Sequence, residues 1–383
     1  MSHSTLKSFM NDGGSQPASS TTEPAPATEP APATEPAPAP EPGTLAPAAS
    51  EPAAQRILRL VLGKAVSRAI GVAAELGLAD HLQRGPLGPD ELARLTKTRA
   101  GVLYRLMRAL AAVGVFEEQA GRRFANNELS AALASDAPAS MRNMARLLAG
   151  DFSWAAWGGL EHSVRSGEVG FDSVFGTDMF SWLAGHPESR QVVQGAMGEL
   201  GDVTGRAVVD AYDFSSLETI VDVGGDSGRL LALILERHPE LRGVLFDRPE
   251  VIAGARRALE ASGQSARITA VGGDFLVSVP SGADAYVMQF ITHDWADEPC
   301  VELLRNCKRS MAPGGRVLIV DAVVGDGPGS ELQKLMDLEL LVMATGRERT
   351  EAEFRTLLTR AGLRLSRILP TRSSVSVIEA FAG

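Results

Sequence analysis

The segment TIVDVGGDSGRLL, residues 219–231, gives the clearest indication of the chain's architecture. Its first five residues are rich in β-branched side chains and are typical of a buried strand. The glycine-rich loop that follows lets the backbone approach a ligand closely, and the N-terminus of the next helix favours negative charge. A strand that continues through such a loop into a helix predicts an α/β fold with a binding site at the carboxyl end of the strand.

Four further apolar runs of strand length follow this segment. Helical patterns such as RLLALILERH and PCVELLRNCKRSM separate them, so we expect right-handed crossovers and a parallel sheet covered on both faces. LRLSRILPT and SVSVIEAFA, near the C-terminus, are separated only by a short turn, which predicts an antiparallel hairpin at the sheet edge. The expected parallel strands are 219–223, 243–247, 268–275, 285–291 and 316–324.

The first 210 residues have a different character. Residues 1–52 contain the repeated unit TEPAPA, and so much proline predicts an extended, polyproline-like tail. Residues 53–210 are helical in pattern, and residues 211–383 form the predicted α/β domain. The first helical segment, ILRLVLGKAVSRAIGVAAELGLADHL, is apolar over more than one stripe, which indicates a surface that meets a second subunit.

Residues 85–133 have the order helix, turn, helix and a short hairpin that ends near Phe124, which is a winged-helix pattern. This pattern raises the alternative of a DNA-binding regulator. Between Asp90 and Leu133, however, seven Arg and Lys residues face five Asp and Glu residues, and this balance is too slight to require DNA binding. We favour a fold that is used for packing and dimerisation.

The composition narrows the possible partners. The 383 residues carry a formal net charge of -10 and a pI near 5.2, which argues against affinity for nucleic acid or anionic membranes. Cys300 and Cys307 are the only cysteines, and we expect two buried thiols in one helix, not a disulfide framework. The N-terminus has no signal-peptide pattern, and no apolar run is long enough to span a bilayer. A soluble cytoplasmic protein is therefore expected.

The glycine loop suggests the class of ligand. A dinucleotide fingerprint needs glycines at relative positions one, three and six, where this chain has Gly224, Asp226 and Arg229. The order Asp222, Gly224, Asp226, Gly228 is instead close to the D-x-G-x-G-x-G loop of S-adenosylmethionine enzymes, with Asp226 in place of the middle glycine. A carboxylate at that position suits a cofactor with an ammonium group better than one with a pyrophosphate.

Two later strand ends carry acids. Asp247 has two interpretations: a helix N-cap with Glu250 completing a capping box, or a carboxylate that accepts hydrogen bonds from ribose hydroxyls. After the glycine loop we favour the ribose. Asp274 and Phe275 end the third strand, where an acid beside an aromatic ring suits an adenine, the alternative being a plain turn.

Several motifs in this order resemble one family. DVGG, FDRPEVI, GGDF, HDWADE and GRERTEAEF are similar to motifs of the S-adenosylmethionine-dependent O-methyltransferases of the caffeic acid type, whose bacterial members modify aromatic polyketides, anthracyclines and hydroxylated carotenoids. The resemblance covers about residues 56 to 383. It implies a winged-helix-like dimerisation domain, a class I methyltransferase (Rossmann-like) domain, S-adenosyl-L-methionine as cofactor and a homodimer.

The resemblance also assigns roles to individual residues. His293, in the HDW motif, matches the family's base, and Asp321 and Glu348 match the two carboxylates that flank it. Asp321 is one methylene shorter than the glutamate usual at its position. Gly224, Asp247, Asp274 and Phe275 match the family's cofactor contacts, to which the glycine loop adds Asp222 and Gly228.

Three residues close to His293 in the sequence have other expected roles. Gln289 stands where the family often has a lysine near the cofactor, and Trp295 packs either on the adenine or only on the core. Asp297, just before a proline and a helical pattern, is expected to be a helix N-cap.

The residues also suggest the chemistry. Only His293, of six histidines, lies at the carboxyl end of a central strand, where a base can activate an acceptor hydroxyl for methyl transfer without a metal. We therefore predict O-methylation of a phenolic or enolic hydroxyl of a small, aromatic polyketide-like secondary metabolite. Two alternatives remain open: the same fold and cofactor with non-methylating chemistry such as hydroxylation, and a DNA-binding regulator.

Overall fold

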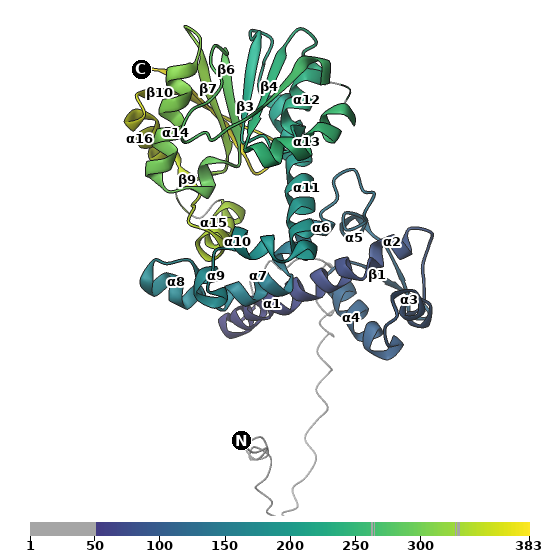
Figure 1. Ribbon diagram of the computed structural model, residues 1–383. Coiled ribbons are helices and arrows are strands. Elements are labelled where there is room, and N and C mark those ends of the chain that lie inside the picture. The colour runs from purple at the N-terminus through teal and green to yellow at the C-terminus, as the bar shows by residue number, and fades with distance from the viewer. Residues whose placement is uncertain (1–50, 262, 264, 326, 328–329) are drawn as a thin grey trace, which may run out of the picture. The chain divides into compact units, whose positions relative to one another are not determined.

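The computed structural model describes residues 51–383, except Ser262, Gln264, Asp326, Pro328 and Gly329. Almost all of the tail predicted for residues 1–52 lies outside the described residues. Figure 1 shows that helices predominate up to Ala211 and that the sheet follows. None of the helices in this described part combines the length and the apolar character that a bilayer-spanning segment needs.

A seven-stranded sheet forms the second half of the chain. Its order is β10-β11-β7-β6-β3-β4-β5, with β3 to β7 parallel and β11 antiparallel to both β7 and β10. The predicted α/β sheet and its antiparallel edge hairpin are therefore confirmed. The strands are β3 (Thr219–Val223), β4 (Arg242–Asp247), β5 (Ile268–Gly272), β6 (Ala285–Gln289), β7 (Arg316–Asp321), β10 (Leu363–Pro370) and β11 (Ser376–Ala382).

Three of these strands end earlier than the sequence predicts. β5 stops at Gly272 because Gly273 N–H donates to the carbonyl of Asp247 and the chain then turns. β6 stops at Gln289 because Phe290 is in the left-handed region, with φ 56°. After β7 the chain forms a separate short strand, β8 (Val323–Val324), which pairs with β9 (Arg349–Thr350).

Helices cover both faces of the sheet, as expected (Figure 1). On one face, α14 (Asp297–Ser310) and α16 (Glu351–Arg360) pack against β6 and β7, and the apolar side chains of α14 recur at helical spacing. On the other face lie α12 (Arg229–Arg237) and α13 (Pro249–Ala261). Cys300 and Cys307 are buried free thiols in α14, which confirms their predicted placement.

The predicted order of helix, turn, helix and hairpin is present in the helical region, after its first two helices. Two helices are followed by the hairpin of β1 (Glu117–Gln119) and β2 (Arg123–Ala125), and Phe124 also pairs with Leu87. The ring of Phe124 is buried in the core of this region. The helices are α1 (Ala53–Glu75), α2 (Leu78–Leu82), α3 (Pro89–Thr96), α4 (Ala100–Ala112), α5 (Glu128–Ala131), α6 (Arg142–Leu148), α7 (Asp151–Trp157), α8 (Leu160–Ser166), α9 (Gly170–Phe175), α10 (Met179–Ala184) and α11 (Pro187–Ala211).

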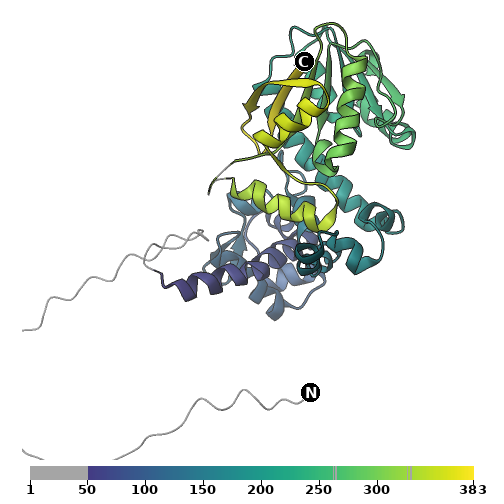
Figure 2. The same ribbon diagram turned by 90° about the vertical axis from the view of Figure 1, so that its left-hand side faces the viewer.

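One later helix returns to this helical region. α15 (Glu331–Met343) packs against α7, α8 and α9, and Figure 2 shows it beside them. Val342 and Met343 of α15 share a buried cluster with Phe152 and Phe171. The domain division predicted between residues 210 and 211 stays a prediction. α15 belongs to the second part of the chain but packs against helices of the first part.

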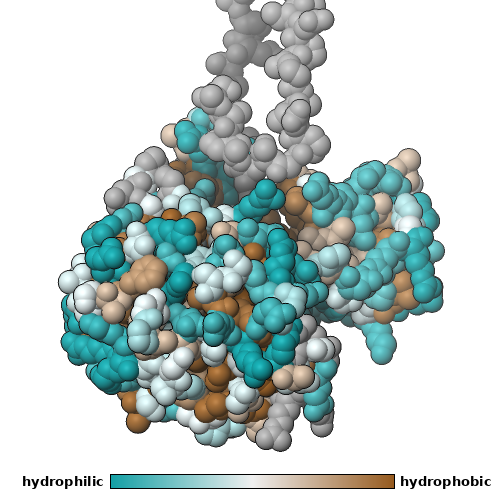
Figure 3. Space-filling model, turned by 90° about the horizontal axis from the view of Figure 1, so that it is seen from above, coloured by the Kyte–Doolittle hydropathy of each residue, from teal (hydrophilic) through white to brown (hydrophobic). Residues whose placement is uncertain are grey.

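The surface is mixed in polarity. On the face seen in Figure 3, hydrophilic residues surround separate apolar patches. The predicted apolar surface of the first helix is present, since five large apolar side chains near the start of α1 are between 51% and 70% exposed. These side chains are Ile57, Leu58, Leu60, Val61 and Leu62.

Candidate active site

The glycine loop after β3 is shaped by tight contacts. Gly224 has φ 70°, and its N–H donates to the carbonyl of Phe246 at 2.7 Å. A Cβ at Gly224 would lie 2.4 Å from Cδ1 of Ile291, and a Cβ at Gly228 would lie 2.8 Å from Leu259. Both positions therefore require glycine, and the bare backbone at Gly224 faces the chain that leaves β6.

Asp247 joins this loop to the end of β4. Its Oδ2 accepts the backbone N–H of Asp226 at 2.9 Å, and its Oδ1 accepts the N–H of Arg248 at 2.7 Å. Burial raises the pKa of the Asp247 carboxyl. Asp226 is exposed and adopts φ 48°, a conformation that aspartate tolerates better than most residues. The carboxylate of Asp247 thus lies at the edge of the sheet with capacity for further hydrogen bonds.

Asp222 lies beneath the loop and is completely buried. Its Oδ2 has no hydrogen-bond partner among the described residues. Burial, and then the charge of Asp247, raise the pKa of Asp222 to about 7. An unsatisfied buried carboxyl oxygen is costly, so this one is suited to a ligand that brings a donor.

Two aromatic rings lie beside this loop. The ring centroids of Phe275 and Trp295 are 5.8 Å apart, with an edge-to-face interplanar angle of 85°. Asp274, next to Phe275, accepts the N–H of Leu276 at 2.8 Å. Gln289 is engaged elsewhere, because its Nε2 donates to Oγ1 of Thr204 on α11 at 2.6 Å. The carboxylate of Asp274 and the rings of Phe275 and Trp295, which follow β5 and β6, suit the binding of a flat nucleobase.

His293 lies in a short 3-10 turn, Thr292–Asp294, between β6 and α14. Its imidazole is 17% exposed, and Nδ1 is 3.3 Å from Oε1 of Glu348. Nε2 is 3.5 Å from Oδ1 of Asp294. The structure therefore brings His293 and Glu348 together, as the sequence predicts, and adds Asp294 on the other ring nitrogen.

Asp321 occupies a different place from Glu348. It is the last residue of β7 and is fully buried, and its Oδ2 accepts a hydrogen bond from the hydroxyl of Thr292. Its Oδ1 has no partner within the part of the chain that the structure describes. Asp321 thus acts on His293 through its charge and through the neighbouring residue, which agrees with its shorter side chain.

These carboxylates change the basicity of the imidazole. Burial lowers the pKa of His293, but the hydrogen bond to Glu348 and the charges of Asp321 and Asp294 outweigh it and raise the pKa to about 9. Burial also raises the pKa of Asp321, to about 6, and that of Asp294. The site therefore holds an unusually basic histidine beside two aspartates, Asp321 and Asp294, whose pKa values are raised.

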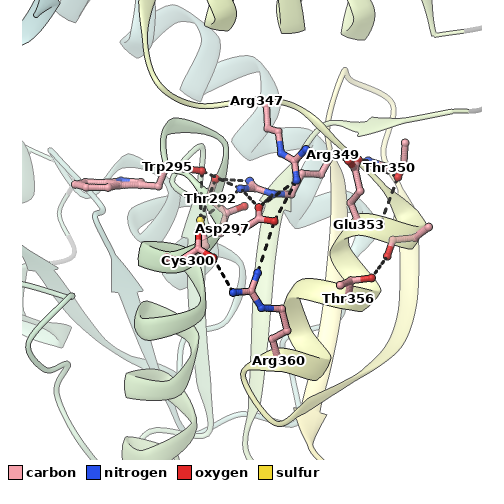
Figure 4. Close-up of polar contacts among 12 residues, drawn as sticks. Thr292, Trp295, Asp297, Cys300, Arg347, Arg349, Thr350, Glu353, Thr356 and Arg360 are labelled. Atoms are coloured by element: carbon pink, nitrogen blue, oxygen red, sulfur yellow. Dashed lines mark hydrogen bonds and ion pairs between the residues drawn. The ribbon is translucent and has the colours of Figure 1, made fainter. Parts of the chain in front are cut away.

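The expected N-cap role of Asp297 is wrong. The N-cap of α14 is Ala296, and Asp297 is the first residue of the helix. Its carboxylate binds Arg349 at 2.9 Å and Arg347 at 3.2 Å, as Figure 4 shows. The side chain turns toward these guanidinium groups because a charged partner outweighs a backbone N–H.

Several polar contacts near the site have no sequence motif that would reveal them. Asp337 of α15 accepts the backbone N–H of Glu348 at 2.8 Å. Glu339 of the same helix accepts the indole N–H of Trp157, on α7, at 2.6 Å. Only the tertiary fold brings these residues together, since they are 11 and 182 positions apart in the chain.

The fold and the site together define a class I methyltransferase. The O-methyltransferase domain matches residues 157–364, and the O-methyltransferase dimerisation domain matches residues 58–149. The chain therefore belongs to the O-methyltransferase family, and it is an enzyme of that class. The second match confirms the predicted dimerisation region.

The relatives come from secondary metabolism. The chain is 40% identical over 333 residues to the phenazine O-methyltransferase PhzM of Lysobacter antibioticus, covering 87% of this chain and 97% of that protein. It is 40% identical to the mitomycin biosynthesis 6-O-methyltransferase of Streptomyces lavendulae, covering 86% and 93%. Relatives named as N-methyltransferases, at 33% and 35% identity, also match.

A solved relative supports the cofactor prediction. The structure of CalO1, a methyltransferase in calicheamicin biosynthesis, matches with a TM-score of 0.79 at 36% identity. The match covers 87% of this chain and all of that one, and that structure is of the SAH-bound form. SAH is what remains of S-adenosylmethionine after methyl transfer. The predicted cofactor class therefore agrees with the family.

Proposed function

We propose that this enzyme transfers a methyl group from S-adenosylmethionine to a phenolic or enolic hydroxyl of a small aromatic secondary metabolite, with His293 as general base. The observation that carries the proposal is the contact between Nδ1 of His293 and Glu348. A proton on Nδ1 shared with Glu348 fixes the tautomer of the imidazole. The lone pair of Nε2 is then available to take the proton of the substrate hydroxyl that accepts the methyl group.

The residues at the carboxyl ends of β3, β4 and β5 fit the cofactor. Asp247 would accept hydrogen bonds from the ribose hydroxyls, as an acid at this strand end does in nucleotide-binding folds. Asp274 would accept a hydrogen bond from the amino group of the adenine, and Phe275 and Trp295 would cover the adenine ring. The loop from Gly224 to Gly228 would lie beside the methionyl part, and the orphaned oxygen of Asp222 suits a ligand with N–H groups. When bound, S-adenosylmethionine supplies an electrophilic methyl group.

The protein's own contribution is to move a proton. A phenol has a pKa near 10, so transfer to an ordinary imidazole costs about 5 kcal/mol, whereas transfer to an imidazole of pKa about 9 costs roughly 1.4 kcal/mol. As the new carbon–oxygen bond forms, the acceptor oxygen becomes more acidic and Nε2 of His293 takes its proton. The charges of Glu348, Asp321 and Asp294 stabilise the resulting imidazolium.

Methylation of nitrogen is a second candidate, because some relatives are named as N-methyltransferases. An aromatic amine is a better nucleophile than a neutral hydroxyl and depends less on a base. The position of the new methyl group, determined by NMR on the product, distinguishes the two reactions.

The test uses S-adenosylmethionine with a panel of dihydroxynaphthalenes and aminonaphthols. We expect products that gain one methylene on oxygen, and a His293→Ala variant that is about 10²–10⁴-fold slower. Cofactor affinity, measured by calorimetry, should remain within a factor of about three. Products that gain oxygen, or methyl groups only on nitrogen, would rule out the proposed reaction.

A further inference from the structure

The sheet holds the chain around His293 at two points only among the described contacts: the N–H of Phe290 donates to the carbonyl of Val320 at 3.1 Å, and the hydroxyl of Thr292 donates to Asp321. β6 ends at Gln289, four residues before His293, and the left-handed Phe290 turns the chain out of the strand. α14 begins only at Asp297. The position of the imidazole therefore depends on what holds the seven residues between the strand and the helix.

One buried guanidinium holds this loop on both sides of the base. Nη1 of Arg349 donates to the carbonyl of Thr292 at 2.6 Å, and Nη2 donates to the carbonyl of Trp295 at 2.8 Å. Figure 4 shows the side chain of Arg349 reaching both residues. A planar guanidinium with several fixed N–H groups can bridge two carbonyls in this way, and a lysine ammonium lacks that geometry.

The charge of Arg349 is compensated within the same cluster. Its side chain is 1% exposed, and a charge so deeply buried is stable only if it is paired. Oδ1 of Asp297 accepts Nη2 at 2.9 Å and Nε at 3.2 Å. The Arg349 bond and charge hold the pKa of Asp297 below its ordinary value, against the effect of burial.

The segment that carries Arg349 also meets the loop through its backbone. The N–H of Arg347 donates to the carbonyl of His293 at 2.8 Å. A Cβ at Gly346 would lie 1.8 Å from the same carbonyl oxygen, so the approach requires glycine. Glu348, between these contacts, binds the imidazole itself. One short segment, residues 346–349, thus contacts the backbone and the ring of His293.

We propose that Arg349, with Asp297 as its counter-ion, is a positioning residue that fixes the His293 loop so that the imidazole meets Glu348. Thr292, Trp295 and the first turn of α14 move as one unit with the segment that carries Glu348. The proposal rests on the proposed function of His293 as the base. It gives Arg349, the buried arginine of the GRERT motif, a role in holding the His293 loop.

The test compares Arg349→Lys with Asp297→Asn, in the full-length enzyme with S-adenosylmethionine and the best acceptor of the dihydroxynaphthalene panel. Both variants should lower kcat by about 10–100-fold and shift the ascending limb of the pH–rate profile, while the KM for S-adenosylmethionine changes less than about threefold. Arg360→Ala is the matched control, since Arg360 binds Asp297 and Glu298 from the exposed side and, among the described residues, does not contact the carbonyls of Thr292 and Trp295. It should keep kcat within about twofold.

The possible outcomes are separable. If Arg349→Lys does not fold, Asp297→Asn decides, because it preserves shape and removes only the counter-charge. Wild-type kcat and an unshifted pH limb in a folded Arg349→Lys or Asp297→Asn enzyme overturn the positioning role, even if stability falls. A His293→Ala enzyme that keeps its rate would instead refute the proposed function, whatever the arginine variants do.

Discussion

At the scale of single residues, the pKa of His293 depends on three carboxylates that contact it in different ways. Glu348 binds Nδ1 directly, Asp294 lies 3.5 Å from Nε2, and Asp321 is bound to Thr292. All three charges favour the imidazolium. Their separate contributions can be tested by removing one charge without removing its hydrogen bond.

Asp321→Asn removes a charge and keeps an oxygen that can accept the Thr292 hydroxyl. Since the Asp321 charge raises the pKa of His293, its loss should lower that pKa. Only the neutral imidazole accepts a proton, so the pH at which the methyl-transfer rate levels off should move down. The measurement is the pH–rate profile of both enzymes between pH 6 and about 10. An unchanged limb would mean that Asp321 serves only Thr292.

Sequence motifs predicted most of the residues of the candidate site and little of their contacts. The glycine loop, Asp247 and Phe275 were accessible because strand ends converge at one edge of a parallel sheet. His293 was indicated by its place at the end of a central strand and by the family resemblance, and Glu348 by the resemblance alone. For Asp294 the sequence left two roles open, capping the turn or steadying the site. Arg349 was not predicted as a site residue, because a charged side chain next to a motif residue is usually solvated and only tertiary structure shows which are buried.

At the scale of elements, the sheet followed from apolar runs and their alternation with helices, and the boundaries did not. β5 ends beside a cross-strand hydrogen bond and β6 ends at a left-handed residue, and neither has an apolar signature. After β7 the chain leaves the sheet and pairs with β9 as β8. Asp297 illustrates the same limit of sequence-based prediction. An acid at the start of a helix can bind a backbone N–H of that helix or a distant arginine, and the sequence shows only the nearby backbone.

The contact between residues 346–349 and the His293 loop predicts the effect of a single methyl group. Gly346→Ala should destabilise the folded state by roughly 1–3 kcal/mol, because the new Cβ overlaps the His293 carbonyl and the two segments must separate. Urea unfolding measures this loss. Gly101→Ala is the control, since Gly101 is exposed in α4 with no atom within 4 Å of the added carbon. Equal stability of both variants would contradict the tight packing.

At the scale of the whole molecule, we propose that a second subunit covers the exposed apolar start of α1. The dimerisation-domain match begins at residue 58, within this surface. Leu60 is 70% exposed there. The apolar pattern of the sequence predicted such a surface, but it could not predict which side chains stay exposed, because core and interface residues have the same composition.

Leu60→Asp should weaken the homodimer by placing a charge in an apolar interface. Sedimentation velocity at micromolar protein should show a shift from dimer toward monomer. Val164→Asp is the control, since Val164 is also 70% exposed but lies in α8, outside the dimerisation match. A dimer of unchanged affinity in Leu60→Asp would place the interface on another surface.

The central claim, that His293 removes the acceptor proton during methyl transfer, is tested most directly by single-turnover rates across pH. The wild-type rate should rise about tenfold per pH unit and level off near pH 9, since the imidazole is protonated below its pKa of about 9. His293→Ala should be at least about 100-fold slower at pH 9 and should lack that limb. A variant that keeps the wild-type rate, or the same limb, would contradict the claim.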